Sequence, residues 1–208
     1  NYTDAPIRVD NDANTAALGE ASLGAGRGFN PVYYVTLGSG VGGGLVIDGT
    51  IYHGALPGEA EIGHLRLSKD GTIVESRCSG WAVDARIRSQ KLENPDSLLT
   101  KTIGIEVRGE ARFLASAVAA NDPFAQKILS EIADDLAFAL SHVTHLMHPE
   151  SIVLGGGLSL VGEALRASVE AALPQYVMHA FQPVPKIVLA GLGEDSVPVG
   201  ALLLAKTA

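Results

Sequence analysis

The fold of this 208-residue chain is decided by the stretch Val32-Tyr33-Tyr34-Val35-Thr36-Leu37-Gly38-Ser39-Gly40-Val41-Gly42-Gly43-Gly44-Leu45-Val46-Ile47. β-Branched and aromatic residues fill Val32–Leu37 and predict a strand, and Gly44–Ile47 predicts another one beyond a glycine-rich turn. The dipeptide Asp48-Gly49 is a strong hairpin signal that leads into a third short run, Thr50–Tyr52. The stretch therefore predicts a β-meander with glycine at its first bend.

The segments on either side of the meander predict helices and two further strands. Asp122, a capping residue followed by a proline, predicts the start of a long helix with regularly spaced apolar residues that ends at Pro149. The other expected elements are helices at Asn14–Ala25, Gly80–Leu92, Glu106–Ala120, Ser159–Leu173 and Val199–Lys206, and strands at Ser151–Leu154 and Lys186–Ala190. This order predicts a mixed α/β fold with a helical portion at about residues 80–149.

Composition narrows the class of protein. Hydrophobic residues make up 47% and charged residues 18% of the chain, which is enough apolar material for a sizeable core. The formal net charge of −8 argues against a nucleic-acid binder and against binding to an anionic membrane surface. The single cysteine, Cys78, excludes an internal disulfide and fits a reducing compartment. No stretch is apolar for long enough to span a bilayer, so we expect a soluble, cytoplasmic protein.

The glycines of the first bend match a dinucleotide-binding motif in sequence but not in its expected structural context. Gly38-Ser39-Gly40-Val41-Gly42-Gly43 fits GxGxxG, but that site requires a helix after the glycines, and here a strand follows. Two interpretations remain. The bare amides and the Ser39 hydroxyl wrap a phosphate group, or the segment is an ordinary glycine-rich hairpin.

A second glycine run, Gly155-Gly156-Gly157, lies between a predicted strand and a predicted helix. Such a turn lets a ligand approach the backbone close to a helix N-terminus, although a tight connection without a ligand is an equally good interpretation. The chain has no GxxxxGK[ST] run and no set of protein-kinase motifs. A nucleotide would therefore be held without a P-loop lysine.

Asn11 and Asp12 stand side by side where a short β-like run gives way to a helix. A carboxylate at such a junction is able to take a proton from a bound hydroxyl, and we expect Asp12 to face a crevice shared with Glu61 and the bend at Gly38–Gly43. The alternative is that Asp12 simply caps the helix.

Other polar and aromatic residues carry weaker signals. Glu61 and His64 lie together in a glycine-flanked loop and suit hydrogen bonds to vicinal hydroxyls, unless this is only a surface loop. The three histidines near the end of the long helix have helical spacing, but polar groups are favoured at a helix C-terminus, so a metal site there is disfavoured. They are His142, His145 and His148. Trp81 is expected to pack in the core or against a loop rather than to form a platform on which a sugar stacks.

Taken in order, these runs resemble the ROK family of sugar kinases and sugar-responsive repressors, which belongs to the hexokinase–actin superfamily. The matching stretches are Asn11–Asn14, Leu37–Gly44, Gly58–His64, Val153–Gly157 and Val199–Ala201. The resemblance implies an actin-like ATPase fold with a ribonuclease H-like lobe. It also implies ATP-dependent phosphorylation of a hexose-type sugar, with Mg²⁺ bound alongside the ATP.

The resemblance assigns roles to individual residues. Asp12 matches the catalytic base, and Asn11, Glu61 and His64 match side chains that hold the sugar hydroxyls. The residues that match the ATP-facing loops are Gly38, Ser39, Gly40, Gly155, Gly156 and Gly157.

The chain departs from the family pattern at the zinc site. Family members carry a CxCGxxGC cluster that binds structural zinc together with the motif histidine. Here His64 is followed by Leu65–Val74 without a cysteine, and Cys78 falls outside the cluster. We therefore predict no structural zinc, with loop packing holding His64. Glu75 matches the family's glutamate beyond the cluster and is expected to contact the sugar.

The chain also starts where the second half of the family's sequences starts. The resemblance thus implies that residues 1–208 are the C-terminal lobe of a kinase whose N-terminal lobe, with its DxGGTK-like phosphate loop, lies outside this chain. The alternatives are the sugar-sensing effector domain of a ROK-type repressor and a kinase-like pseudoenzyme. The identity of the sugar, the choice between ATP and polyphosphate as donor, and a possible homodimer stay open.

Overall fold

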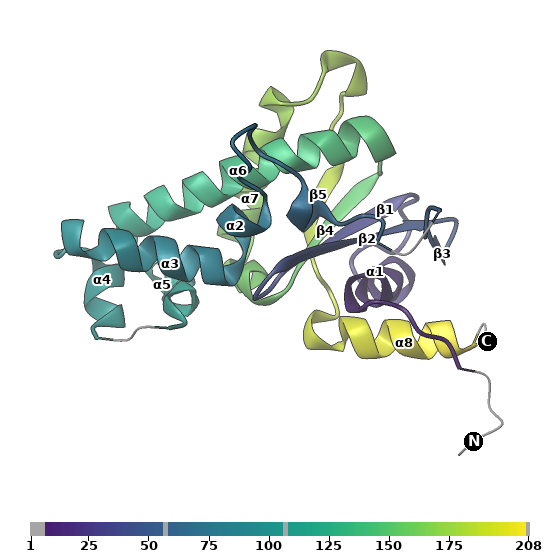
Figure 1. Cartoon of the computed structure of the whole chain (residues 1–208), viewed down its shortest axis with the longest axis horizontal. Coiled ribbons are helices and arrows are strands. Elements are labelled where there is room, and N and C mark those ends of the chain that lie inside the picture. Colours follow the sequence, from purple (N-terminus) through teal and green to yellow (C-terminus); the bar gives the residue numbers. More distant parts are fainter. Residues whose placement is uncertain (1–6, 56–57, 106–107, 207–208) are drawn as a thin grey trace.

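A five-stranded mixed sheet forms the centre of the molecule (Figure 1). The structure is a computed structural model, and it describes residues 7–55, 58–105 and 108–206. The strands are β1 (Val32–Leu37), β2 (Val41–Ile47), β3 (Thr50–Ile51), β4 (Ser151–Gly155) and β5 (Lys186–Leu189). Their order is β3-β2-β1-β4-β5, with β1 antiparallel to β2 and parallel to β4. The carboxyl ends of β1 and β4 therefore lie side by side, with Thr36 opposite Gly155.

The predicted β-meander is confirmed, with one difference in its boundaries. The Asp48-Gly49 turn has φ angles of 52° and 73°, the left-handed values that a two-residue hairpin needs. Strand β2, however, begins at Val41, so Gly42 and Gly43 join Gly44 inside the strand rather than lying in the bend. The reason is tertiary: a Cβ atom at Gly44 would lie 2.8 Å from the Cβ atom of Ala17 on a neighbouring helix. Glycine lets that helix approach the sheet closely.

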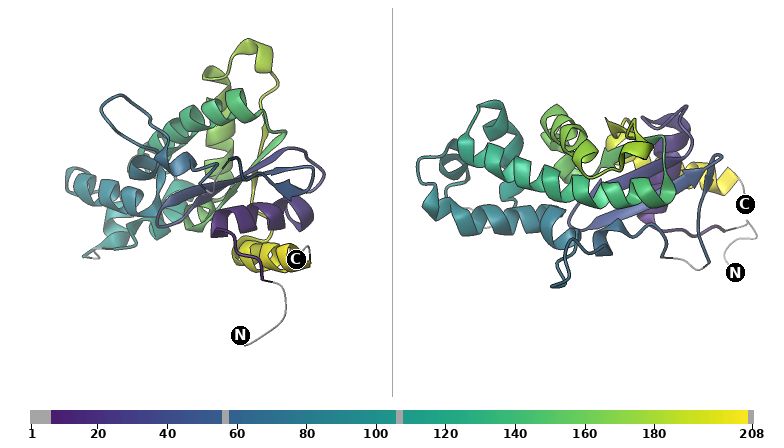
Figure 2. Two further views of the ribbon diagram at one scale, coloured as in Figure 1. Left: turned by 45° about the vertical axis from the view of Figure 1, so that its right-hand side comes forward. Right: turned by 90° about the horizontal axis from the view of Figure 1, so that it is seen from above.

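Helices cover both faces of the sheet and extend beyond one end of it (Figures 1 and 2). The α-helices are α1 (Asp12–Leu23), α2 (Glu75–Cys78), α3 (Gly80–Gln90), α4 (Leu98–Ile103), α5 (Leu114–Ala119), α6 (Pro123–Met147), α7 (Glu163–Ala172) and α8 (Ser196–Lys206). Short 3₁₀ turns are η1 (Ile62–His64), η2 (Lys91–Glu93), η3 (Glu110–Phe113), η4 (Gly157–Val161), η5 (Leu173–Gln175), η6 (His179–Phe181) and η7 (Gly193–Asp195). Helix α1 lies on one face of the sheet with α8 outside it, while α6 and α7 cover the other face.

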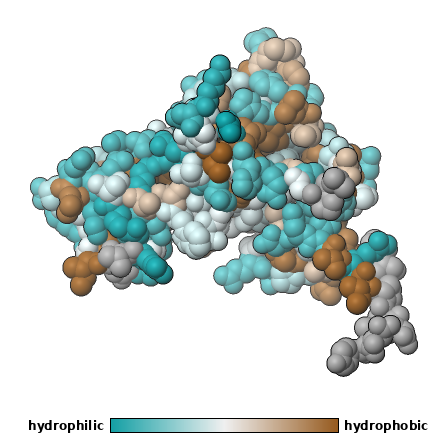
Figure 3. Space-filling model, viewed as in Figure 1, coloured by the Kyte–Doolittle hydropathy of each residue, from teal (hydrophilic) through white to brown (hydrophobic). Residues whose placement is uncertain are grey.

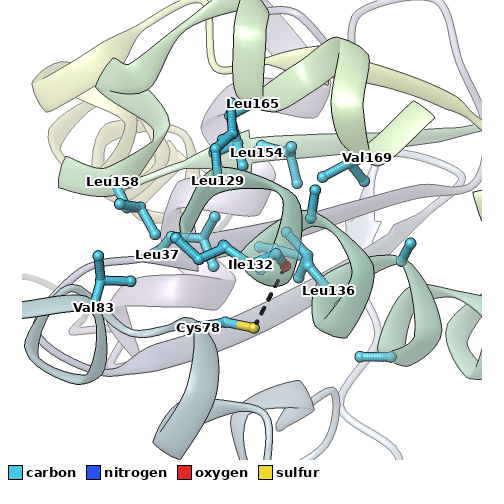
Figure 4. Packing of buried hydrophobic residues seen from close by; sticks show 14 of the residues in the cluster. Leu37, Cys78, Val83, Leu129, Ile132, Leu136, Leu154, Leu158, Leu165 and Val169 are labelled. Atoms are coloured by element: carbon cyan, nitrogen blue, oxygen red, sulfur yellow. Dashed lines mark hydrogen bonds between the residues drawn. The ribbon is translucent and has the colours of Figure 1, made fainter. Parts of the chain in front are cut away.

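Alternate residues of β1 separate into the two cores. Tyr33, Val35 and Leu37 belong to the large apolar cluster beneath α6 and α7, part of which is drawn in Figure 4. Val32 and Tyr34 belong to a smaller cluster under α1. Successive side chains of a strand point to opposite faces, so a strand that is buried on both faces reads as a nearly continuous apolar run.

The long predicted helix is confirmed. Asp122 is its N-cap and accepts a hydrogen bond from the backbone N–H of Ala125, and Pro123 occupies the first turn. The helix ends one residue earlier than its flanking proline suggests, because His148 adopts the left-handed conformation at the C-cap. Its apolar residues are mostly buried, apart from Leu146 and Met147 at its C-terminal end, so this helix is a core element.

Five other predicted helices have different boundaries, two of them only at one end: α3 ends at Gln90 rather than Leu92, and α8 begins at Ser196 rather than Val199. The first helix of the chain runs from Asp12 rather than from Asn14. The predicted helix at Ser159–Leu173 is interrupted by Gly162, whose φ of 79° ends η4 before α7 begins. Residues 106 and 107 of the predicted helix at Glu106–Ala120 lie outside the described ranges, and the rest forms η3 and α5. Helix α4 was not predicted, because its six residues show no clear periodicity.

A buried carboxylate joins α1 to α8. Glu20 is fully buried and accepts four hydrogen bonds, each 2.7–2.9 Å long. The donors are the backbone N–H groups of Ala25, Gly191 and Leu192 and the hydroxyl of Ser196. This carboxylate fixes the C-terminal part of α1 to the loop that leads into α8.

The outer surface of α8 is partly apolar. Leu202 is 67% exposed, and hydrophobic side chains gather at the lower right of the molecule, where α8 lies (Figure 3). Among the described residues, no helix combines the length and the apolar character that a membrane crossing requires.

Candidate active site

Asn11, not Asp12, caps helix α1. The Asn11 side chain accepts a hydrogen bond of 2.6 Å from the backbone N–H of Asn14. Asp12 is the first helical residue and is exposed, and one of its carboxylate oxygens accepts from the adjacent N–H of Ala13 at 2.9 Å. Capping of the helix, which was the alternative to a catalytic role for Asp12, is therefore done by Asn11.

The start of α1 lies against the middle strands. The backbone oxygen of Ala13 would be 2.9 Å from a Cβ atom at Gly44, which places the first turn of the helix directly on β2. On the same face, burial raises the pKa of the Tyr34 hydroxyl, and the negative charges of Glu20 and Asp12 raise it further. The Asp12 carboxylate therefore lies close enough to the centre of the sheet to act on a β1 side chain.

Two glycine turns meet at the carboxyl ends of β1 and β4. Gly156 has a φ of 80°, and a Cβ atom there would lie 2.6 Å from the backbone nitrogen of Leu37. The other turn is closed by a hydrogen bond of 2.9 Å from the N–H of Gly38 to the carbonyl of Gly40. In open α/β sheets ligands bind outside the carboxyl ends of the strands, which is where these turns lie.

A cavity of about 520 Å³ opens beside the two turns. It brings together three residues that were predicted to contact nucleotide: Gly38, Ser39 and Gly157. The other predicted glycines lie beneath these turns. A Cβ atom at Gly155 would lie 2.2 Å from the hydroxyl oxygen of Tyr34, so this glycine makes room for a core side chain.

Sequence reasoning missed part of the cavity wall. Asp84 is buried, and its carboxylate accepts hydrogen bonds of 2.9 and 2.7 Å from the backbone N–H groups of Gly109 and Ala111. Arg112 and Trp81 also line the cavity. The expectation that Trp81 packs in the core or a loop is wrong, because 72% of its surface is exposed. No local pattern identifies these residues, because α3 and the segment at 109–112 meet only in the folded chain.

The loop that carries Glu61 and His64 runs along the part of β2 that β3 leaves uncovered. Asn14 of α1 donates to the carboxylate of Glu59 at 2.6 Å, which ties this loop to α1. The Tyr33 hydroxyl donates to the carbonyl of Ala60 at 2.8 Å on the opposite face of the sheet from α1. Burial raises the pKa of Tyr33, and the nearby Glu61 carboxylate raises it further.

Glu61 and His64 are both exposed and line a cavity of about 340 Å³ next to the end of α6. Ala13, next to Asp12, contacts Gly44 of β2 from one face of the sheet. Ala60, next to Glu61, contacts Gly43 from the other face. Glu61 lines this cavity and the first glycine turn lines the larger one, while Asp12 lines neither, so the expected shared crevice stays a prediction.

Glu75 supports the first glycine turn. One of its carboxylate oxygens accepts from the backbone N–H of Val41 at 2.9 Å and would lie 2.5 Å from a Cβ atom at Gly40. The residue thus lies where the turn enters β2. Its predicted contact with a sugar stays a prediction.

The segment that replaces the family's cysteine cluster forms a small hairpin. The N–H of Leu67 donates to the carbonyl of Thr72, and the N–H of Val74 donates to that of Leu65. At the tip, the Ser68 hydroxyl and the backbone N–H of Thr72 lower the pKa of Asp70 to about 2. Backbone pairing therefore holds this segment together.

Cys78 does not fit a zinc site. Its thiol is buried in the core, points toward the carbonyl of Ile132 (Figure 4), and has a pKa raised to about 12 by burial and then by the charge of Asp135. Zinc binds thiolates rather than neutral thiols. The described part of the chain also contains no group of three or more His, Cys, Asp or Glu residues arranged to hold a metal ion.

Purified protein is accordingly expected to contain far less than one equivalent of zinc. Treatment with a strong chelator should leave its melting temperature unchanged, because the hairpin after His64 is closed by protein hydrogen bonds. Elemental analysis together with a thermal melt checks both points. Stoichiometric zinc whose removal lowers the melting temperature would contradict this prediction.

The three histidines of α6 have structural partners. The Nε2 atom of His145 accepts a hydrogen bond of 3.0 Å from the backbone N–H of Met178. The His142 ring meets Phe138 edge-on at 4.8 Å, and His148 is the C-cap of the helix.

The chain is similar in sequence and in structure to known proteins. The sequence model of the ROK family matches residues 1–208. A glucokinase from Thermotoga maritima is 32% identical over 96% of this chain, and one from Halalkalibacterium halodurans is 34% identical over 98%. The crystal structure of a ROK family glucokinase from Streptomyces griseus, in complex with glucose and AMPPNP, superposes with a TM-score of 0.89 at 30% identity. That match covers 98% of this chain and 69% of the Streptomyces chain.

These matches confirm the predicted actin-like fold. They also show that the chain spans only about two thirds of the two curated glucokinases, 66% of the first and 64% of the second.

Proposed function

The chain belongs to the ROK family, and from that premise we propose that it is the C-terminal lobe of a two-lobed sugar kinase that transfers a phosphoryl group from ATP to a hexose-type sugar. The single observation that carries the proposal is the convergence of the two glycine turns on one cavity. The similarity to glucokinases over nearly the whole chain supports it.

In this proposal the phosphates of the nucleotide lie against the glycine turns. The exposed backbone at Gly157 and the Ser39 hydroxyl supply hydrogen-bond donors where negative charge accumulates, while Gly38, whose N–H is bonded to the carbonyl of Gly40, shapes its turn. Gly40, Gly155 and Gly156 act indirectly, since their missing side chains let Glu75, Tyr34 and Leu37 approach and shape the turns. Mg²⁺ bound to the nucleotide would neutralise part of the phosphate charge, with phosphate oxygens and water as its expected ligands.

Asp12 is the proposed general base. Its carboxylate accepts the proton of the sugar hydroxyl as that oxygen attacks the γ-phosphorus atom and ADP leaves. Because Asn11 already caps α1, the Asp12 carboxylate is available for this role. Asn11, Glu61, His64 and Glu75 are proposed to hold the sugar hydroxyls, with the Asn14–Glu59 hydrogen bond keeping the sugar loop in register with α1.

The proposal is tested by sugar-dependent release of ADP from the intact gene product. A panel of hexoses and N-acetylhexosamines should contain at least one sugar that stimulates ADP release well above the rate without sugar. A protein that binds a sugar without turning over ATP would instead be a sensor of the repressor type or a pseudoenzyme. We further propose that the enzyme works in the cytoplasm; a homodimer is to be tested by its mass in solution.

A further inference from the structure

The wall of the nucleotide cavity has two chemically different parts. Beside the glycine turns it presents backbone groups and the Ser39 hydroxyl. The rest is largely apolar and is formed by Leu158, Val161, Ala111 and Ala115, together with the side chains of Trp81 and Leu160; Asp84 and Arg112 are its charged residues. Inorganic polyphosphate is anionic along its whole length and has no group that would favour the apolar part.

Trp81 lies at this cavity because the start of α3 is bonded to the first glycine turn. The backbone N–H of Gly80 donates to the carbonyl of Gly38 at 2.7 Å. Val83 and Ile87 direct one face of α3 into the core. Trp81 stays outside that core, 72% exposed, immediately next to the residue that contacts the turn.

The second glycine turn contributes a matching apolar residue. Leu160 follows Gly157 within η4, is 81% exposed, and lines the same cavity as Trp81. Two large apolar side chains exposed at one cavity are unfavourable in water, and such exposure is typical of a binding site. A flat heteroaromatic ring stacks favourably on an indole face.

The wall between them is held in place before any ligand arrives. The buried Asp84 carboxylate accepts from the N–H groups of Gly109 and Ala111, and the neighbouring Glu110 carboxylate accepts two hydrogen bonds from Arg88, at 2.7 and 2.8 Å. A rigid wall lowers the entropy cost of binding.

We propose that Trp81 stacks on the base of the nucleotide, with Leu160 as a further apolar contact, and that this residue selects a nucleoside triphosphate over inorganic polyphosphate as the phosphoryl donor. This inference rests on the proposed function. It assigns a specificity-determining residue for the donor and leaves the phosphate contacts to the glycine turns.

Intrinsic fluorescence of the intact protein provides a direct test, because Trp81 is the single tryptophan of this chain. Addition of ADP should quench the fluorescence, whereas sodium tripolyphosphate should not. The ADP-dependent change should disappear in Trp81→Phe, which would show that it does not come from a tryptophan elsewhere in the gene product.

Kinetics provide the second readout. Trp81→Ala should raise the KM for ATP about tenfold or more, with the kcat and the KM for the sugar within about twofold of wild type. Trp81→Phe should recover most of the affinity for ATP, since a phenyl ring still stacks. Leu92→Ala is the matched control: Leu92 is 84% exposed near the other end of α3 and is not among the residues lining the cavity, so its KM for ATP should not change.

Three results would overturn the inference: an unchanged KM for ATP in Trp81→Ala, equal quenching by tripolyphosphate, or a change confined to the KM for the sugar or to the mass in solution. The last would assign Trp81 to the sugar or to a protein interface. Failure of the proposed function looks different, since turnover would then be absent for every sugar while quenching by ADP could still be measured.

Discussion

Replacement of Asp12 by asparagine is expected to lower the kcat of the intact kinase by about 10²- to 10⁴-fold, the usual contribution of a general base. The amide has nearly the same shape as the carboxylate but cannot accept the proton of the sugar hydroxyl. The affinity for the sugar should change little, because the amide still forms hydrogen bonds. Steady-state kinetics and calorimetric titration with the sugar measure the two quantities separately.

Stability separates this result from a structural effect. Asn11 supplies the N-cap, so Asp12→Asn removes only a favourable charge near the helix N-terminus, worth about 0.3–1 kcal/mol. Asp48→Asn is the matched control, since Asp48 lies in the hairpin turn at the opposite end of β2, where asparagine also tolerates the left-handed conformation. Wild-type kcat in Asp12→Asn would remove Asp12 from the proposed chemistry.

Replacement of Glu20 by alanine is expected to lower the free energy of unfolding by about 3 kcal/mol. Three backbone N–H groups lose their acceptor, and each partly buried donor left unpaired costs about 1 kcal/mol, the lower end of the range for buried groups. The Ser196 hydroxyl loses an acceptor as well but keeps its second hydrogen bond, to the carbonyl of Gly193. Urea denaturation of the intact protein, followed by circular dichroism, measures the change.

Two further variants make the Glu20 prediction specific. Glu20→Gln keeps one acceptor oxygen but directs an NH₂ group at N–H donors, so its stability should fall between that of alanine and wild type. Glu194→Gln changes an exposed glutamate in the same segment and should match wild type. Equal stability of wild type and Glu20→Ala would show that water replaces the carboxylate at no cost.

Much of the fold was predictable because its signals are local. The spacing of Phe124, Ile128 and Ile132 and the Asp122-Pro123 start correctly predicted α6, since a helix buries one stripe of its surface. The run Val32–Leu37 and the Asp48-Gly49 turn predicted the meander, since strand content and hairpin geometry depend on adjacent residues. Boundaries were less certain wherever glycine occurred in a regular element, as at Gly42–Gly44 and Gly162.

The candidate site was predictable only in part. The sequence indicated Asn11 and Asp12 at a helix start but could not say which of them caps it, because both side chains suit that position. The sequence predicted that glycines of both turns contact a nucleotide, but Gly157 is the one glycine of the second turn that lines the cavity. The prediction that Trp81 packs in the core or against a loop was wrong, because the exposure of a side chain depends on which distant segments pack against it.

The order of elements, the apolar stripes, the turns and the family membership were thus determined by the chain's sequence itself, since they follow from chemistry between near neighbours. Tertiary structure alone decided which glycines make room for α1 or for Tyr34. It also decided which carboxylate joins α1 to α8, and which side chains between residues 37 and 161 surround one cavity. Those outcomes depend on contacts between segments that are distant in the sequence, and short-range sequence patterns do not predict such contacts.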